Sequence, residues 1–446
     1  MIQMSPEIVV ILMFGTLILG LALGHPIAFV LGGIGVVFGV LGWGPESMHL
    51  IVSRAFDSTS NYLLIAIPLF ILMATFLEKS GIAEGLFNSM LYLFGPLNGA
   101  IALTVTTMCI VFAACTGIMG ATVVSMSLMS MPIMMRHKYD KHLATGIVAA
   151  GGSLGIIIPP SIMLVMMADR SGISVGKLFA GGLIPGVLLA VLFFIYIAIL
   201  CTIRPDKGPA LTIEERTAIP TRQKVIMLLK NLVPPLLLIF GVLGSIWFGI
   251  ATPSEAAGVG ALTSFILMVV YGRFSFSSLK DAFNSAFKSS CMVMAVIIGA
   301  TCFTGVFIGL GGGRVVTDLI MAFDFMGPWG MFFIMMFIVF ILGFLIDWIG
   351  IIYITFPIFM PIAMQLGFDP LWFVIVLAVN LQMSFITPPF GYALFYVKGT
   401  VTPDMGIKLI DIYKGIIPFV LLQMLGLVIV SVWPQLATWL PTLVGN

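Results

Sequence analysis

Charged residues are scarce in this chain. Asp, Glu, Lys and Arg make up 9% of its 446 residues, whereas a soluble domain carries roughly 25%. Hydrophobic residues account for 60%. The formal net charge of +2 is too small to indicate a nucleic-acid partner. The composition therefore predicts a chain that lives in a lipid bilayer.

The signatures of metal-binding and catalytic sites are also absent. The five cysteines show no CxxC spacing, and the four histidines form no HExxH motif. A glycine-rich stretch at residues 309–313 lacks the Lys-Ser/Thr pair of a phosphate-binding loop. No arrangement of serine, histidine and aspartate indicates a hydrolase. These absences argue against a metal or disulfide framework and disfavour a membrane-embedded enzyme.

Long apolar runs are present instead. Residues 178–200, 232–250 and 331–346 approach the ~20 apolar residues that a helix needs to cross a bilayer. Their length excludes the short alternating strands of a membrane barrel. The N-terminus has no basic stretch of the kind that begins a cleavable signal peptide, and its apolar run extends from Ile8 past Val40. We interpret that run as membrane structure.

One pattern of residues occurs twice, 229 positions apart. The matching positions are Pro132, Asp140 and Pro159–Pro160 in the first copy and Pro361, Asp369 and Pro388–Pro389 in the second. Each copy therefore interrupts an apolar stretch with a double proline. Two interrupted membrane segments at corresponding places in two halves point to the substrate and ion site of a secondary transporter.

A polar linker at residues 204–230 divides the chain into a first repeat, 1–203, and a second repeat, 231–446. Re-entrant helical hairpins are expected at 98–135 and 329–364, and proline-broken transmembrane helices at 143–168 and 372–397. The other expected crossings are 8–24, 26–42, 62–78 and 178–200 in the first repeat and 231–250, 255–271, 290–309 and 412–436 in the second.

Five crossings in each half is an odd number, so the second copy is expected to be inverted relative to the first. Loop charge agrees, because residues 136–142 are basic whereas residues 365–371 contain no Lys or Arg. With the linker in the cytoplasm, only four of the twenty Lys and Arg lie outside. These are Arg54, Arg170, Lys177 and Arg314. The sequence thus predicts an all-α integral membrane protein with two inverted-topology repeats.

The two double prolines predict unwound backbone inside the membrane. Each pair removes two N–H donors and frees carbonyl oxygens upstream. Such backbone is tolerated only where protein or a water-filled cavity surrounds it. Freed carbonyls suit a monovalent cation, and half-helix N-termini suit an anion. A simple proline kink is the alternative, but two kinks at matching positions favour a binding site.

Several single residues are candidates beside these breaks. Gly117 and Gly343 lie in the two hairpins, where either ion coordination by the backbone or close helix packing explains a glycine. Asp347 is the clearest functional candidate, because an ionisable group at membrane depth is costly; a satisfied structural carboxylate is the alternative. Asp169 and Lys398 are interpreted as side chains that snorkel toward the membrane surface.

Five motifs occur in order along most of the chain. They are GIIIPPS at 155–161, GKLFAGGLIPG at 176–186, GIATPSEAA at 249–257, GFDP at 367–370 and TPPFG at 387–391. In these motifs the chain resembles the large membrane subunit of tripartite ATP-independent periplasmic (TRAP) transporters. The resemblance implies a sodium-coupled, elevator-type importer in the bacterial inner membrane. It also implies a small carboxylate substrate, a periplasmic substrate-binding protein that delivers it, and a small four-helix membrane subunit.

The resemblance further implies that each Na+ site pairs a hairpin tip with the broken span behind it. The first sodium site would use Thr116, Gly117, Gly155, Ile158 and Pro160. The second would use Gly343, Ser384, Thr387 and Phe390. Most ligands would be backbone carbonyls, with the Thr387 hydroxyl as a side-chain ligand. The substrate would lie between the two tips, near Thr122, Ser161, Asp347 and Asn380.

One departure from the family pattern concerns the first tip, where many members have a Ser-Ser pair and this chain has Ile118-Met119. The first ion would then be held by backbone oxygens alone, or the tip would have a different geometry. The departure argues against a sialic-acid or C4-dicarboxylate substrate and favours another organic acid, such as a 2-oxo acid. The alternative function is an ion-coupled organic anion exporter or antiporter that needs no binding protein.

Overall fold

The computed structural model describes residues 5–117, 119–217, 219–388 and 391–444. This described part is helical and contains no strand. Eight of its helices are long and apolar enough to cross a membrane. The predicted all-α membrane fold is confirmed.

The first half of the chain begins with five helices, α1 to α5, followed by a helical hairpin, an interrupted helix and a final long helix. Its elements are α1 (Pro6–Ala22), α2 (Ile27–Trp43), α3 (Ser47–Thr59), η1 (Tyr62–Ile65), α4 (Ala66–Lys79), α5 (Ile82–Phe94), α6 (Ala100–Thr116), α7 (Met119–Arg136), α8 (Lys141–Ser153), η2 (Leu154–Ile156), α9 (Ile162–Ser171) and α10 (Val175–Ile203). The pair α6 and α7 occupies the first expected hairpin, and α8 and α9 occupy the first expected broken helix.

After a short connecting region, the second half also has a set of helices, then a helical hairpin, an interrupted helix and a final long helix. Its elements are η3 (Pro205–Lys207), α11 (Ile213–Thr217), α12 (Thr221–Trp247), α13 (Pro253–Val270), α14 (Phe276–Gly309), α15 (Gly312–Met321), η4 (Asp324–Met326), α16 (Gly327–Leu345), α17 (Trp348–Gln365), α18 (Pro370–Ser384), α19 (Tyr392–Thr400), η5 (Pro403–Met405), α20 (Leu409–Val432), α21 (Gln435–Thr438) and η6 (Leu440–Leu443). The pair α16 and α17 occupies the second expected hairpin, and α18 and α19 the second broken helix.

Helix boundaries recur at the spacing seen in the sequence. Adding 229 to the bounds of α7 gives 348–365, which are the bounds of α17. The same shift moves α6 onto 329–345, inside α16, and α8 onto 370–382, inside α18. The two broken helices also begin alike, since Asp140 accepts a hydrogen bond from the Leu143 N–H at 3.0 Å and Asp369 accepts one from the Trp372 N–H at 2.8 Å.

Two predicted boundaries differ from the structure. Helix α12 begins at Thr221, so the last part of the expected 204–230 linker is helical. Helix α14 begins at Phe276, although a crossing was expected only from 290. Both early segments carry exposed charged residues, such as Arg222 and Lys280, which interrupt an apolar run without preventing a helix. Hydropathy marks where lipid contact begins and does not mark where a helix begins.

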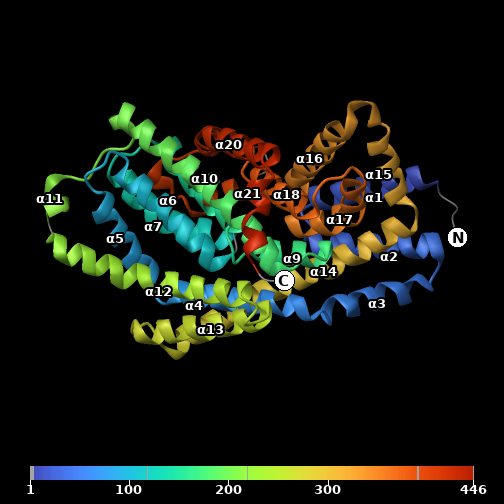
Figure 1. Ribbon diagram of the computed structural model, residues 1–446, viewed down its shortest axis with the longest axis horizontal. Helices are drawn as coiled ribbons and strands as arrows, with labels where there is room; N and C mark the ends of the chain where they lie inside the picture. The colour runs from blue at the N-terminus through green and yellow to red at the C-terminus, as the bar shows by residue number, and fades with distance from the viewer. Residues whose placement is uncertain (1–4, 118, 218, 389–390, 445–446) are drawn as a thin grey trace.

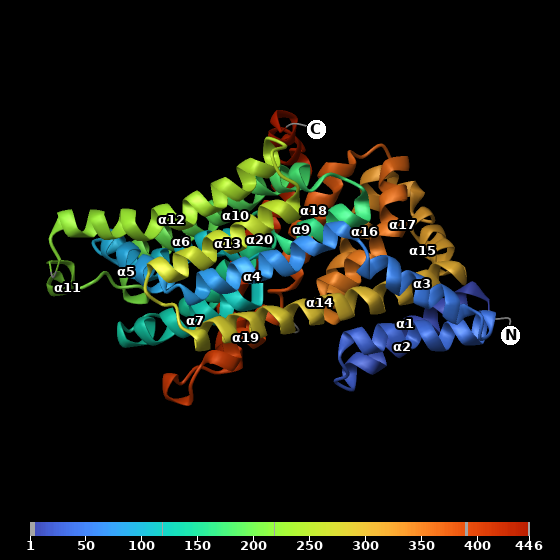
Figure 2. The ribbon, with the colours of Figure 1, turned by 90° about the horizontal axis from the view of Figure 1, so that it is seen from below.

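The two halves are packed through each other. Helix α2 of the first half lies against α14 of the second, and α4 lies against α13. In Figure 1, α3, α4, α12, α13 and α14 run along the lower side, with α10, α18 and α20 above them. Figure 2 shows α4, α13 and α14 extended along the same direction. These long helices form a frame against which the hairpins and broken helices are placed.

Candidate functional site

The first break is a buried stretch of irregular backbone between α8 and α9. Pro159 and Pro160 have no N–H, so the carbonyls of Gly155 and Ile156, four residues earlier, lose their helical donors. The Ser161 hydroxyl donates to the Ile156 carbonyl and also accepts from the Leu164 N–H at 3.3 Å, which caps α9. The Gly155 carbonyl accepts no hydrogen bond from the residues that the structure describes. It is therefore available to a cation.

The tip of the first hairpin lies directly against this break. Gly117 ends α6 in the left-handed conformation, with φ of 60°. A Cβ atom at this position would lie 2.8 Å from the Pro160 carbonyl oxygen. One turn earlier, Ala113 faces Gly155, where an added Cβ would lie 3.4 Å from the Ala113 Cα. The end of α6 thus contacts both sides of the break, and at position 117 only glycine permits this approach.

The structure therefore brings together Gly117, Gly155 and Pro160 of the predicted first sodium site. Ile158 lies in the same break and is 3% exposed. Thr116 is the last residue of α6, and its side chain lies outside the described residues, as does Ile118. Gly117, Gly155 and Pro160 have no side-chain oxygen, so their backbone carbonyls are the oxygens that these three residues offer to an ion.

The second break is held differently. The Ala393 N–H donates to the Phe385 carbonyl at 3.3 Å, and the Gly391 N–H donates to the Thr387 carbonyl at 3.1 Å. The Thr387 hydroxyl donates to the Met383 carbonyl at 2.7 Å, which leaves its own lone pairs free to face a cation. Phe390, predicted for the second sodium site, lies outside the described residues. More of the carbonyl oxygens are used by the backbone here than in the first break.

Gly343 does not lie at the tip of the second hairpin, where the predicted second sodium site had placed it. It lies within α16, which continues to Leu345. An added Cβ would lie 2.5 Å from the Ser384 Cβ, so Gly343 lets α16 and α18 pack closely. The structure thus brings together two residues predicted for the second site, but through helix packing. The turn itself is formed by Ile346 and Asp347.

Asp347 lies where the second hairpin approaches α19. Its carboxylate caps α17 by accepting from the Ile349 N–H at 3.4 Å, and the side chain is partly exposed. Tyr392 and Tyr396 lie one turn apart on α19, within electrostatic range of this carboxylate. An added Cβ at Gly120, near the first tip, would lie 3.0 Å from the Tyr396 ring. Helix α19 therefore lies near both hairpin tips, and the negative charge of Asp347 favours a bound cation beside it.

Tyr392 and Tyr396 were missed in the sequence, although a signal for them exists. They follow the second double proline at a spacing of four residues, which places both on one face of a helix.

Three of the four predicted substrate residues have their side chains buried within the protein. Ser161 is fully buried and bonded to backbone, as described above. The Asn380 amide donates to the Met336 carbonyl in α16 at 2.6 Å and is 1% exposed. Thr122 is fully buried in α7. Of the four, Asp347 is the one with partial exposure between the tips.

A buried polar network surrounds Asp169, so the snorkelling interpretation of this residue is wrong. Its side chain is 6% exposed and pairs with Arg170 at 2.7 Å. It also accepts from the Asn61 amide at 2.5 Å and from the Tyr353 hydroxyl at 3.4 Å. The Arg170 guanidinium lies 4.5 Å from the centre of the Tyr353 ring. The network joins α9 to α17 and to the turn before α4.

A second polar cluster joins the two broken helices. The Gln382 amide donates to the Ser153 hydroxyl at 3.3 Å, although the two residues are 229 positions apart in the sequence. The Gln423 amide from α20 donates to the same hydroxyl at 3.2 Å. These two bonds hold the end of α8 against α18 and α20.

The atoms of the candidate site that could bind a cation are oxygens of backbone carbonyl, hydroxyl and carboxylate groups. Among the described residues, no group of three or more His, Cys, Asp or Glu side chains comes together to bind a metal. Neutral carbonyl and hydroxyl oxygens with a single carboxylate suit a hard monovalent cation such as sodium better than a transition metal.

Comparison with known proteins shows the family to which this chain belongs. A model of the family described as "Tripartite ATP-independent periplasmic transporter, DctM component" matches residues 14–436. The chain belongs to this family. It is thus a large permease subunit of a TRAP transporter, a multi-pass membrane protein and not an enzyme.

Named relatives of this TRAP permease differ in the substrates that they carry. The C4-dicarboxylate TRAP transporter large permease protein of Vibrio cholerae is 30% identical over 99% of this chain and 98% of its own length. The corresponding protein of Pseudomonas aeruginosa is 31% identical over 91% of this chain and 92% of its own. An isethionate TRAP transporter permease protein of Oleidesulfovibrio alaskensis is 30% identical over 95% of this chain and 65% of its own length.

Solved structures of other transporters share the fold at low identity. The Alcanivorax borkumensis YdaH transporter aligns with a TM-score of 0.61 at 14% identity, covering 91% of this chain and 96% of its own. Neisseria gonorrhoeae MtrF aligns with a TM-score of 0.55 at 14% identity, covering 87% and 84%. These likenesses concern the fold alone.

Proposed function

We propose that this TRAP permease is a sodium-driven, elevator-type importer of a small organic acid in the bacterial inner membrane. A periplasmic substrate-binding protein delivers the acid, and a small four-helix membrane subunit completes the transporter. The contact between Gly117 and the Pro159–Pro160 break carries the proposal. It places an unoccupied backbone carbonyl of Gly155 beside a hairpin tip inside a membrane-spanning protein.

The proposal includes two inverted repeats. Support comes from the matching bounds of α7 and α17 and from the bond between Ser153 and Gln382. Inversion gives each half a hairpin that approaches the centre from the opposite membrane side. One hairpin then closes the site to the outside and the other closes it to the inside.

The proposal also divides the molecule into a frame and a moving body. The frame consists of α1 to α4 and α12 to α14, whose cross-half packing of α2 on α14 and α4 on α13 holds it together. The hairpins and broken helices form the moving body. Here α7 lies against α19 and α17 lies against α9, so each hairpin is packed on the broken helix of the other half. Such interlocking favours movement as one unit.

Two sodium ions have different environments in this scheme. The first is held by backbone oxygens near Gly117 and Gly155, and the second by the Thr387 hydroxyl with the Asp347 carboxylate nearby. The substrate anion lies between the tips, where the N-terminus of α9 supplies partial positive charge. Relatives named for C4-dicarboxylates, isethionate and 2,3-diketo-L-gulonate all carry acids, which supports an acidic substrate.

Uptake in proteoliposomes tests the proposal. The large and small subunits are reconstituted together, and the binding protein is supplied outside with its labelled ligand. Two sodium ions with one monovalent anion carry a net charge of +1, worth about 2.3 kcal/mol per 100 mV. Uptake should therefore require a sodium gradient and rise with an inside-negative voltage. Uptake indifferent to both would overturn the proposal, and uptake of free substrate without the binding protein would favour the exporter or antiporter alternative.

A further inference from the structure

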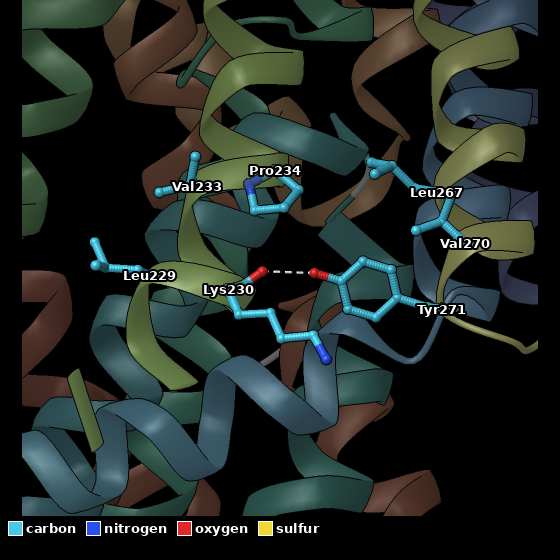
Figure 3. Close-up of a pocket in the computed structure, with 7 residues that line it drawn as sticks. All are labelled: Leu229, Lys230, Val233, Pro234, Leu267, Val270 and Tyr271. Carbon is cyan, nitrogen blue, oxygen red and sulfur yellow. Dashed lines mark hydrogen bonds between the residues drawn. The ribbon is translucent and has the colours of Figure 1, made fainter. Parts of the chain in front are cut away.

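A groove with a volume of about 460 Å³ lies between α12 and α13 (Figure 3). Its lining residues are Leu229, Lys230, Val233 and Pro234 from α12 and Leu267, Val270 and Tyr271 from the end of α13. The volume falls within the range of roughly 300–1,000 Å³ that is usual for sites of small organic molecules. None of these residues belongs to the ion and substrate site described above.

The groove has a definite structural origin. Pro234 has no N–H, so the Lys230 carbonyl, four residues earlier in α12, has no helical donor. The Tyr271 hydroxyl donates to that carbonyl at 2.6 Å, as the dashed line in Figure 3 shows. This bond ties the end of α13 to α12 at one point. Beside it, the two helices are separated by apolar side chains.

The walls of the groove are aliphatic and face outward. Leu229 is 55% exposed and Val270 is 72% exposed. Val233 is also exposed, and Leu267 is partly buried. In helices that cross a membrane, such exposed aliphatic side chains face lipid chains. The walls therefore suit an acyl chain rather than a polar solute.

One end of the groove carries a positive charge. Lys230 is exposed and takes part in none of the ion pairs between described residues. Nearby cations have other contacts, since Arg273 pairs with Glu84 at 3.0 Å and Lys224 lies 5.9 Å from the centre of the Tyr92 ring. Tyr271 lies at the same end, as aromatic residues do at the membrane boundary. The groove therefore has an ammonium group at one end and aliphatic walls beside it, which complement the phosphate and the acyl chain of a phospholipid.

We propose that this groove binds one anionic phospholipid. Its phosphate lies at the Lys230 ammonium, and an acyl chain lies along Val233, Leu267 and Val270. The Lys230 ammonium favours a headgroup with a net negative charge over a zwitterionic one. A lipid in this position holds α12 and α13 together at the edge of the frame. The inference requires that the chain spans a membrane and does not depend on its substrate or ion coupling.

Native mass spectrometry of the intact large subunit in detergent tests the proposal. The probe is phosphatidylglycerol, with phosphatidylcholine as the zwitterionic comparison. One tightly bound phosphatidylglycerol is expected. Lys230→Gln should weaken its binding about fivefold, the effect of one basic residue near an anionic lipid surface. Val270→Trp, which keeps the charge and fills the groove, should weaken it as well.

Lys280→Gln is the matched control. Lys280 is an exposed lysine on α14, in the next helix after Tyr271, and does not line the groove. Equal phosphatidylglycerol binding by the wild-type chain and Lys230→Gln would overturn the proposal. Competition by inorganic phosphate would overturn it too, because a free anion would then account for the site. Displacement of the lipid by the small membrane subunit, with cross-links to Val233, would show that the groove is a subunit interface instead.

Discussion

At the scale of single residues, Gly117 has the strictest requirement. Its φ of 60° and the Pro160 carbonyl 2.8 Å from an added Cβ both exclude a side chain. Gly117→Ala should therefore displace the tip from the break and abolish sodium-dependent uptake, with left-handed strain adding about 1–2 kcal/mol. Gly15→Ala is the control, because Gly15 lies within α1 with open space around it. Uptake by Gly117→Ala equal to that of Gly15→Ala would contradict the site.

Thr387 offers a test of the second ion. Its hydroxyl donates to the Met383 carbonyl, and the lone pairs of its oxygen can still coordinate a cation. Loss of this oxygen in Thr387→Ala should raise the sodium concentration for half-maximal uptake about tenfold, since one such interaction is worth about 1–1.5 kcal/mol. Thr387→Ser keeps the oxygen and should restore most of the sodium affinity. Unchanged sodium activation in Thr387→Ala removes this residue from the ion site.

At the scale of helices and turns, the Asp169 network fastens α9 to its neighbours. Asp169→Ala leaves the Arg170 guanidinium, whose side chain is 29% exposed, without its carboxylate, and loss of a charged partner destabilises a protein more than loss of a neutral hydrogen bond. Asp169→Ala should therefore lower Tm by more than Asn61→Ala, which removes one hydrogen bond from the same carboxylate.

The double substitution Asp169→Ala with Arg170→Met completes this comparison. It removes both charges together, so it should recover much of the Tm lost in Asp169→Ala. Thermal unfolding of the purified protein in detergent measures all three variants. A double variant as unstable as Asp169→Ala would mean that the ion pair is not the reason for the loss.

The broken helices show which elements the sequence predicts well. The double prolines and the capping residues Asp140 and Asp369 act within a few residues of themselves, so their effects are visible in the sequence. Gly343 shows the opposite case. It was expected at the hairpin tip, but Ile346 and Asp347 form that turn, and Gly343 packs against Ser384 on another helix. Asp169 was misjudged for the same reason, because Asn61 and Tyr353 approach it only in three dimensions.

At the scale of the whole molecule, the cross-half packing makes each half dependent on the other. With α2 on α14 and α4 on α13, the apolar faces of the frame are shared. A chain cut between residues 217 and 218 should give halves that are degraded when expressed alone and form a stable, sodium-dependent transporter when expressed together. Immunoblots and size-exclusion chromatography measure this.

The position of the cut matters for this experiment. Residues before it are bound to the base of the first hairpin, since the Gly99 N–H donates to the Gly208 carbonyl at 2.7 Å and the Asp140 N–H donates to the Lys207 carbonyl at 2.9 Å. Cutting at residue 204 should separate this segment from its hairpin and give less complex than the later cut. Stable accumulation of either half by itself would contradict the shared frame.

The sequence alone determined that this protein lies in a lipid bilayer, that it is helical, and where its helices break. Apolar run length decides membrane insertion, and proline and capping residues act on adjacent backbone, so no distant contact is needed. Only the tertiary structure decided which polar atoms are used within the protein and which remain available to a ligand. The Ser161 and Asn380 polar groups are used by the Ile156 and Met336 carbonyls, whereas the Gly155 carbonyl accepts nothing from the described residues. The hydrogen-bond partners of a polar atom are residues close to it in space, and these are brought together only when the chain folds.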